Sequence, residues 1–276
     1  MATPLSDIAY AKINLALHVR ARRADGYHEL ETLFAFLEDG DRLTIGQSPT
    51  FELVVTGPMA VDLADEEDNL VLRAARLLAV RADVSGGASF TLDKRLPVAA
   101  GLGGGSADAA AALRLAAQLW GIDPRSALLA ETARELGADV PACLASVTSF
   151  GRGVGDILTP VDLDDVKGAS VLLVNPLMAC PTGPVFQAWD GEDRGALDPQ
   201  GWRFGRNDLQ APACRMVDEI DDVLTVLRAQ LPDVARMSGS GATCFAVFAD
   251  QQQRDAAAVR IADDHPDWWV MSGALR

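Results

Sequence analysis

The residues best suited to chemistry lie in one glycine-rich stretch, residues 96–108, with the sequence LPVAAGLGGGSAD. Glycine lets the backbone adopt positive φ and lie directly against a ligand. Strong helix formers follow, so the loop leads into a helix N-terminus, where free N–H groups and the helix dipole favour an anion. Lys94 and Arg95 precede the loop, and two cations suit a phosphate better than a neutral ligand. Ser106 and Asp108 are expected as the N-cap and a first-turn residue of that helix.

Two common nucleotide-binding loops do not match these glycines. A Walker A loop needs a lysine directly after its last glycine, which this stretch lacks. In the dinucleotide fingerprint G-x-G-x-x-G, Gly101 and Gly103 fit, but Ser106 occupies the position of the third glycine. A tight turn packed against a helix is the non-functional alternative. The pattern P-x-x-x-G-L-G-G-G-S, which begins at Pro97, instead resembles the phosphate loop of the GHMP kinases.

A second group of polar residues alternates with apolar ones along residues 7–20. This period of two predicts a strand with one apolar face, and Lys12 and Asn14 lie on its other face. The pattern fits a strand face exposed to solvent, and it also fits two side chains directed into one cleft. The turn that follows is predicted by its Asp-Gly pair and carries two amphipathic rings, those of Tyr27 and His28.

The composition limits the classes of protein that fit. With 276 residues, nearly half of them apolar, the chain can bury a sizeable core and form two domains. The formal net charge of −15 argues against nucleic-acid binding, so a nucleotide site here has to be locally positive. Cys143, Cys180, Cys214 and Cys244 form no C-x-x-C pair, which argues against zinc and fits a reducing compartment. We see no signal sequence or membrane-spanning run and expect a cytoplasmic protein with no membrane partner.

Periodicity and turn residues predict alternating strands and helices. Further strands are expected at residues 33–37, 42–45, 51–55, 88–92, 146–150, 171–174, 235–237, 243–248 and 268–271. Helices are expected at residues 70–78, 107–115, 124–136, 141–144, 184–189, 208–230 and 251–264. The acidic residues 65–68 together with Asn69 are expected to cap the first of these helices. A turn is expected at residues 39–41, and the acidic turn 162–165 is the expected linker between domains. We therefore predict an α+β fold of two domains, with helices packed on mostly antiparallel sheets.

Four parts of the chain together resemble one family of GHMP kinases, the 4-diphosphocytidyl-2-C-methyl-D-erythritol kinases of the non-mevalonate isoprenoid pathway. They are residues 11–15 with 24–28, residues 93–97 leading into the glycine loop, residues 137–141, and residues 238–243. The sequence ADGYH at residues 24–28 narrows the resemblance to this family. The resemblance implies a two-domain GHMP kinase fold with the active site in the cleft between the domains. The N-terminal domain (1–160) would bind ATP, and the C-terminal domain (161–276) would contribute to the substrate site.

The resemblance also implies roles for individual residues. Asp139 corresponds to the proposed base toward the acceptor hydroxyl, with Lys12 beside it as the second catalytic residue. The substrate-binding residues would be Asn14, Tyr27, His28 and Phe186. The ATP-binding residues would be Asn69, Leu70, Lys94, Pro97, Gly101, Leu102, Gly103, Gly104, Gly105 and Ser106. Mg²⁺ is the expected cofactor alongside ATP, with its ligands unassigned, and Asp108 either binds it or caps the helix.

The implied reaction is ATP-dependent phosphorylation of the 2-hydroxyl of 4-diphosphocytidyl-2-C-methyl-D-erythritol, a cytidine diphosphate derivative, by a monomer or homodimer. Two alternatives stay open: another GHMP kinase acting on mevalonate, homoserine or a sugar, and a non-catalytic nucleotide-binding regulator. Tyr27 and His28 argue against the first, because those acceptors offer no base to stack. Intact Lys12 and Asp139 argue against the second, although Asp139 by itself would also suit a helix cap.

Overall fold

The computed structural model describes residues 5–63 and 69–276. Internal contacts divide the chain into two compact units. Unit 1 takes the described residues of 1–11, 39–98 and 103–146, and unit 2 takes those of 12–38, 99–102 and 147–276. The sequence predicted one boundary after residue 160, whereas the units interleave along the chain. They interleave because strands β1 (Leu5–Arg22) and β2 (His28–Ser48) each contribute residues to both units.

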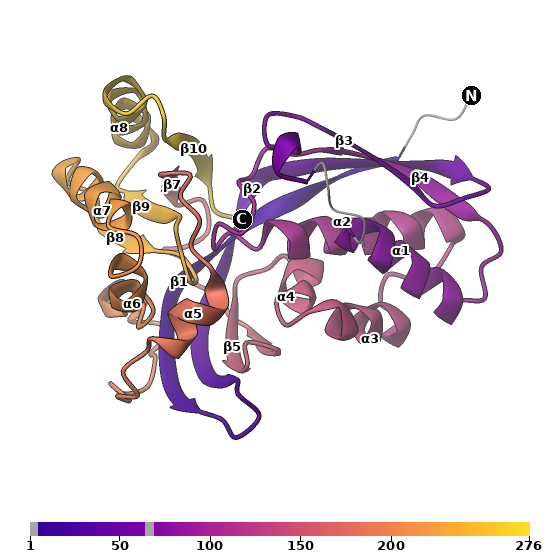
Figure 1. Ribbon diagram of the computed structural model, residues 1–276, viewed down its shortest axis with the longest axis horizontal. Helices are drawn as coiled ribbons and strands as arrows, with labels where there is room; N and C mark the ends of the chain where they lie inside the picture. Colours follow the sequence, from indigo (N-terminus) through magenta and orange to yellow (C-terminus); the bar gives the residue numbers. More distant parts are fainter. Residues whose placement is uncertain (1–4, 64–68) are drawn as a thin grey trace. The chain divides into compact units, whose positions relative to one another are not determined.

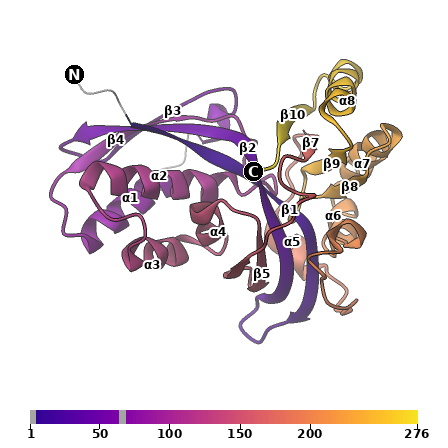
Figure 2. The same cartoon turned by 180° about the vertical axis from the view of Figure 1, so that it is seen from behind.

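In unit 1, helices lie on one face of a small sheet (Figures 1 and 2). The sheet has the order β3 (Glu52–Thr56), β4 (Gly87–Asp93) and the second half of β2. Strand β4 is antiparallel to β2 and parallel to β3. The helices are α1 (Leu70–Arg81), α2 (Gly104–Trp120), α3 (Ala127–Leu136) and α4 (Val140–Ala145), and a 3₁₀ helix spans Ala60–Leu63. The alanine-rich α2 is the buried helix of this unit, since its small side chains let α1, α3 and α4 pack closely around it.

Unit 2 contains two sheet regions. The first part of β2 pairs with β5 (Ser149–Gly153), which pairs with β6 (Ile157–Pro160). The second sheet is antiparallel, with the order β10 (Trp269–Ala274), β7 (Ser170–Asn175), β9 (Cys244–Phe248) and β8 (Val234–Met237). Helices α7 (Glu219–Ala229) and α8 (Gln251–Asp264) pack on this second sheet (Figure 1). Shorter helices are α5 (Thr182–Gln187), α6 (Gln210–Cys214) and a 3₁₀ turn at Trp202–Phe204. The predicted α+β class with mostly antiparallel sheets is confirmed.

The turn predicted at residues 39–41 does not exist, because β2 continues through it. Gly40 is needed there for a different reason. A Cβ atom added at Gly40 would lie 2.0 Å from the carbonyl oxygen of Ala9, so the two backbones meet at van der Waals contact. The residue that follows, Asp41, is fully buried.

Three predicted helix starts also differ from the structure. Helix α2 begins at Gly104 with Gly103 as its N-cap, so Ser106 and Asp108 lie inside the helix. Helix α3 begins after Ser126, whose side chain caps it, and not at residues 123–124. The long helix predicted over 208–230 is two helices, because three acidic residues favour a new N-terminus at the start of α7.

Other predictions hold. Asn69 caps α1 as expected, with its Oδ1 accepting a hydrogen bond of 2.9 Å from the backbone N–H of Val71. The acidic residues 65–68 that were expected to support this cap lie outside the described residues. Within the described part of the chain, the helices are too short or too polar to cross a lipid bilayer.

Candidate active site

The first half of the glycine loop, residues 99–102, is bound within unit 2 by two other sequence motifs. The carbonyl of Leu102 accepts a hydrogen bond of 3.0 Å from the backbone N–H of Lys12 on β1. The carbonyl of Gly101 accepts one of 2.8 Å from Oγ of Ser238. Gly101 has φ +75°, and a Cβ atom there would lie 2.4 Å from the carbonyl oxygen of Ser238, so another residue would not fit.

Lys12 and Asn14 occupy a buried face of β1, each with about 3% of its surface exposed. The solvent-exposed alternative for this face is therefore wrong. Nζ of Lys12 donates to Oδ1 of Asn14 at 3.0 Å, and Nδ2 of Asn14 donates to Oγ1 of Thr32 at 2.8 Å. Oγ of Ser238 accepts a hydrogen bond of 3.1 Å from the backbone N–H of Asn14 while it donates to Gly101. One serine hydroxyl thus joins the predicted substrate strand to the glycine loop.

The second half of the loop forms the N-terminus of α2 in unit 1. Its N-cap residue, Gly103, has φ +63° and makes no side-chain capping bond. The N–H groups of the first helical turn, at Gly104, Gly105 and Ser106, have no partner within the helix and lie at the positive end of the helix dipole. Gly105 is exposed, and a Cβ atom there would lie 3.4 Å from the side chain of Leu70. The N-termini of α1 and α2, which were both expected to bind ATP, therefore lie side by side. Pro97, which was also expected to contact ATP, is buried where the chain enters the loop.

Lys94 lies beneath this helix start and is buried between two carboxyl groups. Its Nζ is 2.6 Å from Oδ2 of Asp41 and 2.6 Å from Oδ2 of Asp108. A Cβ atom added at Gly104 would lie 3.1 Å from the same Nζ. Oδ1 of Asp41 accepts hydrogen bonds from the backbone N–H groups of Arg95 and Leu96, at 2.5 and 2.8 Å. The charge of the Lys94 ammonium group therefore lies next to the glycine loop and is neutralised there by the two carboxyl groups.

The burial of these charges shifts their pKa values. Burial raises the pKa of Asp108 to about 7, although the positive charge of Lys94 opposes the shift. Burial alone would lower the pKa of Lys94, but the charges of Asp108 and Asp41 outweigh it and raise that pKa. Asp108 was expected either to bind Mg²⁺ or to cap the helix. Its side chain pairs with Lys94 and does not cap the helix.

Asp139 stands at the N-cap position of α4 in unit 1 and is half-buried. Its side chain makes no capping hydrogen bond to the helix. The capping role that sequence alone would favour therefore does not account for this carboxylate. Its predicted catalytic partner, Lys12, belongs to unit 2.

Two of the three predicted base-binding rings meet in unit 2. The ring centroids of His28 and Phe186 are 5.1 Å apart, with the rings tilted by 39°. Trp189, which the sequence did not single out, packs edge-on against His28 at 5.7 Å. Tyr27 instead remains 63% exposed on the turn before β2. Burial lowers the pKa of His28, and the charge of Arg22 lowers it further, so its imidazole is neutral at physiological pH.

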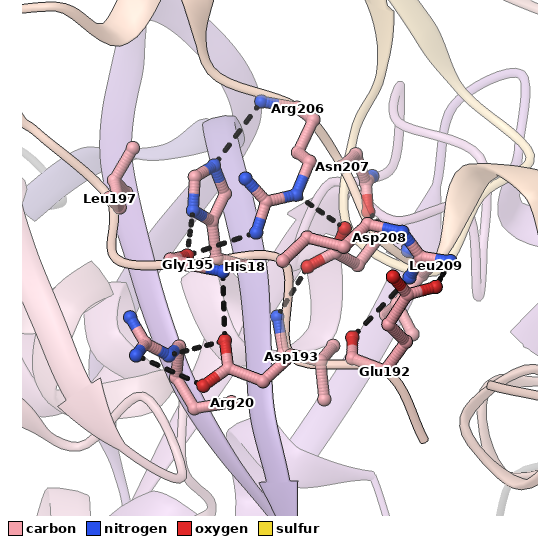
Figure 3. Close-up of polar contacts among 12 residues, drawn as sticks. His18, Arg20, Glu192, Asp193, Gly195, Leu197, Arg206, Asn207, Asp208 and Leu209 are labelled. Carbon is pink, nitrogen blue, oxygen red and sulfur yellow. Dashed lines mark hydrogen bonds and ion pairs between the residues drawn. The ribbon is translucent and has the colours of Figure 1, made fainter. Parts of the chain in front are cut away.

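His18 lies further along the buried face of β1 that carries Lys12, and it holds a loop in place (Figure 3). Its Nε2 accepts a hydrogen bond of 3.3 Å from the backbone N–H of Arg206, so Nδ1 carries the proton and donates to the carbonyl of Gly195 at 3.0 Å. The guanidinium of Arg206 donates to Asp208, whose other carboxylate oxygen accepts from the backbone N–H of Val19. This network attaches residues 195–208 to β1 and is structural.

The sequence interpretation missed Asp41, which it placed in a turn. A signal was present, because Asp41, Leu43 and Ile45 follow one another at every second position and all three are buried. A lone carboxylate on an apolar strand face requires a buried cation as partner. Lys94, whose charge had been expected at the nucleotide, is that cation.

Comparisons with known proteins identify the family. The GHMP kinases N terminal domain profile matches residues 69–146, and the GHMP kinases C terminal profile matches residues 188–267. A 4-diphosphocytidyl-2-C-methyl-D-erythritol kinase from Rhizorhabdus wittichii is 53% identical to this chain, over 98% of this chain and 94% of its own length. The enzyme of that name from Sphingopyxis alaskensis is 50% identical over the full length of both. This chain belongs to that family of GHMP kinases.

Solved structures agree with this assignment. A crystal structure of a 4-(cytidine 5'-diphospho)-2C-methyl-D-erythritol kinase aligns with this GHMP kinase at a TM-score of 0.83 and 34% identity, covering 98% of this chain and 99% of that one. A mevalonate kinase from Methanococcus jannaschii aligns at a TM-score of 0.70 and 9% identity, over 100% of this chain and 99% of that one. The second likeness shows the shared fold alone.

Proposed function

We propose that this kinase transfers the γ-phosphoryl group of ATP to the 2-hydroxyl group of 4-diphosphocytidyl-2-C-methyl-D-erythritol. The observation that carries the proposal is the contact between His28 and Phe186, next to the turn that presents Tyr27. Aromatic rings and an imidazole suit a planar base, and mevalonate, homoserine and sugars have none to offer. The names of relatives at about 50% identity support the same substrate.

ATP would bind through the N-terminus of α2. The N–H groups of Gly104, Gly105 and Ser106 are suited to phosphate oxygens, and Asn69 and Leu70 at the start of α1 would contact the adenine. Within the described residues, no three His, Cys, Asp or Glu side chains are grouped as metal ligands. That arrangement fits Mg²⁺, which commonly binds through substrate phosphates and one or two carboxylates. When bound, Mg²⁺ would neutralise phosphate charge.

The proposed roles of Asp139 and Lys12 follow from the chemistry of phosphoryl transfer. The acceptor oxygen forms a bond to the γ-phosphorus, the bond to the β,γ-bridging oxygen breaks, and ADP leaves. A carboxylate is a weak base toward an alcohol, so Asp139 orients the hydroxyl and accepts its proton late. Lys12 offsets the negative charge on the transferred group. Tyr27, His28 and Asn14 hold the acceptor.

A substrate panel tests this function. The purified chain is incubated with ATP, Mg²⁺ and, in separate reactions, the cytidyl substrate, mevalonate, homoserine and galactose, and ADP release is measured. Turnover is expected with the cytidyl substrate alone. Turnover with another alcohol would favour a different GHMP kinase, and ATP binding without turnover would favour a regulator. We further propose that the chain acts in the cytoplasm as a monomer or homodimer.

A further inference from the structure

The hydrogen bond between Arg22 and His28 determines which imidazole nitrogen carries a proton. Nε of Arg22 lies 3.4 Å from Nε2 of His28. A guanidinium nitrogen can only donate, so Nε2 must accept through its lone pair. Neutral imidazole has a single N–H group, and it is therefore at Nδ1. Among the described residues, the contact with Arg22 is the one hydrogen bond of the His28 ring, so the N–H at Nδ1 is available to a ligand.

The surroundings of His28 favour this neutral form. Burial lowers the pKa of the ring, and the positive charge of Arg22, at the end of β1, lowers it further. The other neighbours are the uncharged rings of Phe186 on α5 and Trp189 just after it. A charge that approaches from one side and apolar rings on the others both disfavour the imidazolium.

Arg22 is itself held in place. Its Nη2 donates a hydrogen bond of 3.2 Å to the carbonyl of Gln187, the last residue of α5. Arg22, Gln187 and Trp189 line one open cavity of about 580 Å³. The side chain of Arg22 thus connects β1 to the end of the helix that carries Phe186, and its Nε–H faces the imidazole.

We propose that Arg22 is a positioning residue that keeps His28 in the Nδ1–H tautomer, so that the ring presents a fixed N–H donor to the base of the acceptor substrate. This inference rests on the proposed function. A pyrimidine base offers lone pairs on its carbonyl oxygen and ring nitrogen, and a neutral ring with the opposite tautomer would place a lone pair against them. Without Arg22, the Nε2–H tautomer of His28 becomes accessible. Molecules in that tautomer lose the hydrogen bond to the base.

The pH dependence of a variant distinguishes this role from direct contact. In Arg22→Met, the KM for the cytidyl substrate should rise roughly fivefold at about pH 8, the effect of one lost hydrogen bond. At a pH below the pKa of the variant's imidazole, which nitrogen-15 spectra measure, it should return toward the wild-type value, because the imidazolium carries protons on both nitrogens and restores the donor at Nδ1. The wild-type KM should differ little between the two pH values.

Two further variants are controls. Arg22→Lys, which keeps a donor and a charge, should behave like the wild type. Arg260→Met, on the exposed face of α8, removes an arginine far from His28 in the sequence and should also behave like the wild type.

A spectroscopic readout separates this proposal from the proposed function. The chain has three histidines, so nitrogen-15 spectra of the imidazoles are simple, and His28→Asn assigns the signals of His28. The wild type should show the Nδ1–H tautomer at His28, and Arg22→Met should shift it toward Nε2–H. If the tautomer is unchanged in Arg22→Met, or if KM rises equally at both pH values, the proposal is wrong. If the tautomer shifts while the wild type fails to phosphorylate the cytidyl substrate, the proposed function fails and the role of Arg22 stands.

Discussion

Nζ of Lys94 lies 2.6 Å from Oδ2 of Asp108, and both side chains are almost completely buried. Asp41 contacts the same ammonium group at 2.6 Å, so two carboxyl groups share one cation. Oδ1 of Asp108 is buried and has no hydrogen-bond partner among the described residues, which disfavours the ionised form of this carboxyl group. The cluster therefore binds a proton more tightly in the folded chain than in the unfolded one.

The first prediction concerns the effect of pH on stability. The pKa of Asp108 rises from 3.8 to about 7 on folding, so the folded state holds more protons across that window and stability falls as pH rises through it. Between about pH 5 and about pH 7.5 the loss should be about 2 kcal/mol. Asp108→Asn cannot ionise and should remove this part of the pH dependence. Urea unfolding of both proteins at the two pH values measures the difference.

Lys94 does not complicate this comparison. Its pKa is raised above 10.5, so it stays protonated in both states across the window, and its contribution is lost above that range. Equal pH slopes for the wild type and Asp108→Asn would show that Asp108 is ionised in the folded chain throughout.

The second prediction tests the catalytic carboxylate. Asp139→Asn should lower the rate of phosphoryl transfer by roughly 10²–10⁴-fold, the usual cost of losing a positioned acid–base group. Asparagine matches aspartate in size and shape, so the binding of both substrates should be nearly unchanged. Single-turnover kinetics and calorimetry measure the two effects separately. Asp123→Asn, an exposed carboxylate of the same unit, is the control, and an Asp139→Asn rate within about threefold of wild type would remove the proposed role.

The third prediction tests stacking on the exposed ring of Tyr27. Stacking of a base on an aromatic side chain is worth about 1–3 kcal/mol. Tyr27→Ala should therefore raise the KM for the cytidyl substrate roughly tenfold or more and leave the KM for ATP unchanged. Tyr27→Phe keeps the ring and should resemble the wild type. A parallel rise of both KM values in Tyr27→Ala would mean that the ring supports the turn and does not bind the base.

Much of the fold could be predicted because its signals are local. The alternation along residues 7–20 predicted β1, and the helix expected at residues 251–264 is α8 with the same bounds. Asn69 was expected to cap a helix, and its side chain does so by accepting a hydrogen bond from the backbone N–H of Val71. The motifs of the site could be recognised for the same reason, since each is a short run of neighbouring residues.

What the sequence did not reveal depends on contacts between distant segments. The sequence Asp39-Gly40-Asp41 is typical of a turn, but pairing with β4 and the close approach of Ala9 keep it in β2. The partners of Lys94 stand 53 and 14 residues away along the chain, so its burial could not be inferred from its neighbours. The interleaved units likewise follow from the length of β1 and β2, which were each expected to be shorter.

The last prediction compares two glycines that share a left-handed backbone conformation. Gly101 has φ +75° and Gly121 has φ +69°. An alanine at either position should cost about 1–2 kcal/mol in backbone strain. At Gly121, which ends α2, the added Cβ meets no atom of the described residues within 4 Å, so backbone strain is the expected cost. At Gly101 it would also lie 2.4 Å from the carbonyl oxygen of Ser238, and the loop has to move.

Moving the loop should affect ATP more than it affects folding, because residues 101–106 were assigned to the phosphates and their N–H groups would shift together. Gly121→Ala should lower the Tm by about 2–8 °C, as expected for 1–2 kcal/mol in a protein of this size, and leave ATP affinity unchanged. Gly101→Ala should have a lower Tm than Gly121→Ala and bind ATP at least tenfold more weakly, since several charge-assisted hydrogen bonds are misaligned at once. Thermal unfolding followed by circular dichroism gives the first quantity and calorimetry with ATP the second. If Gly101→Ala binds ATP as tightly as Gly121→Ala, the loop is a packing turn, and ATP has to be held by other residues.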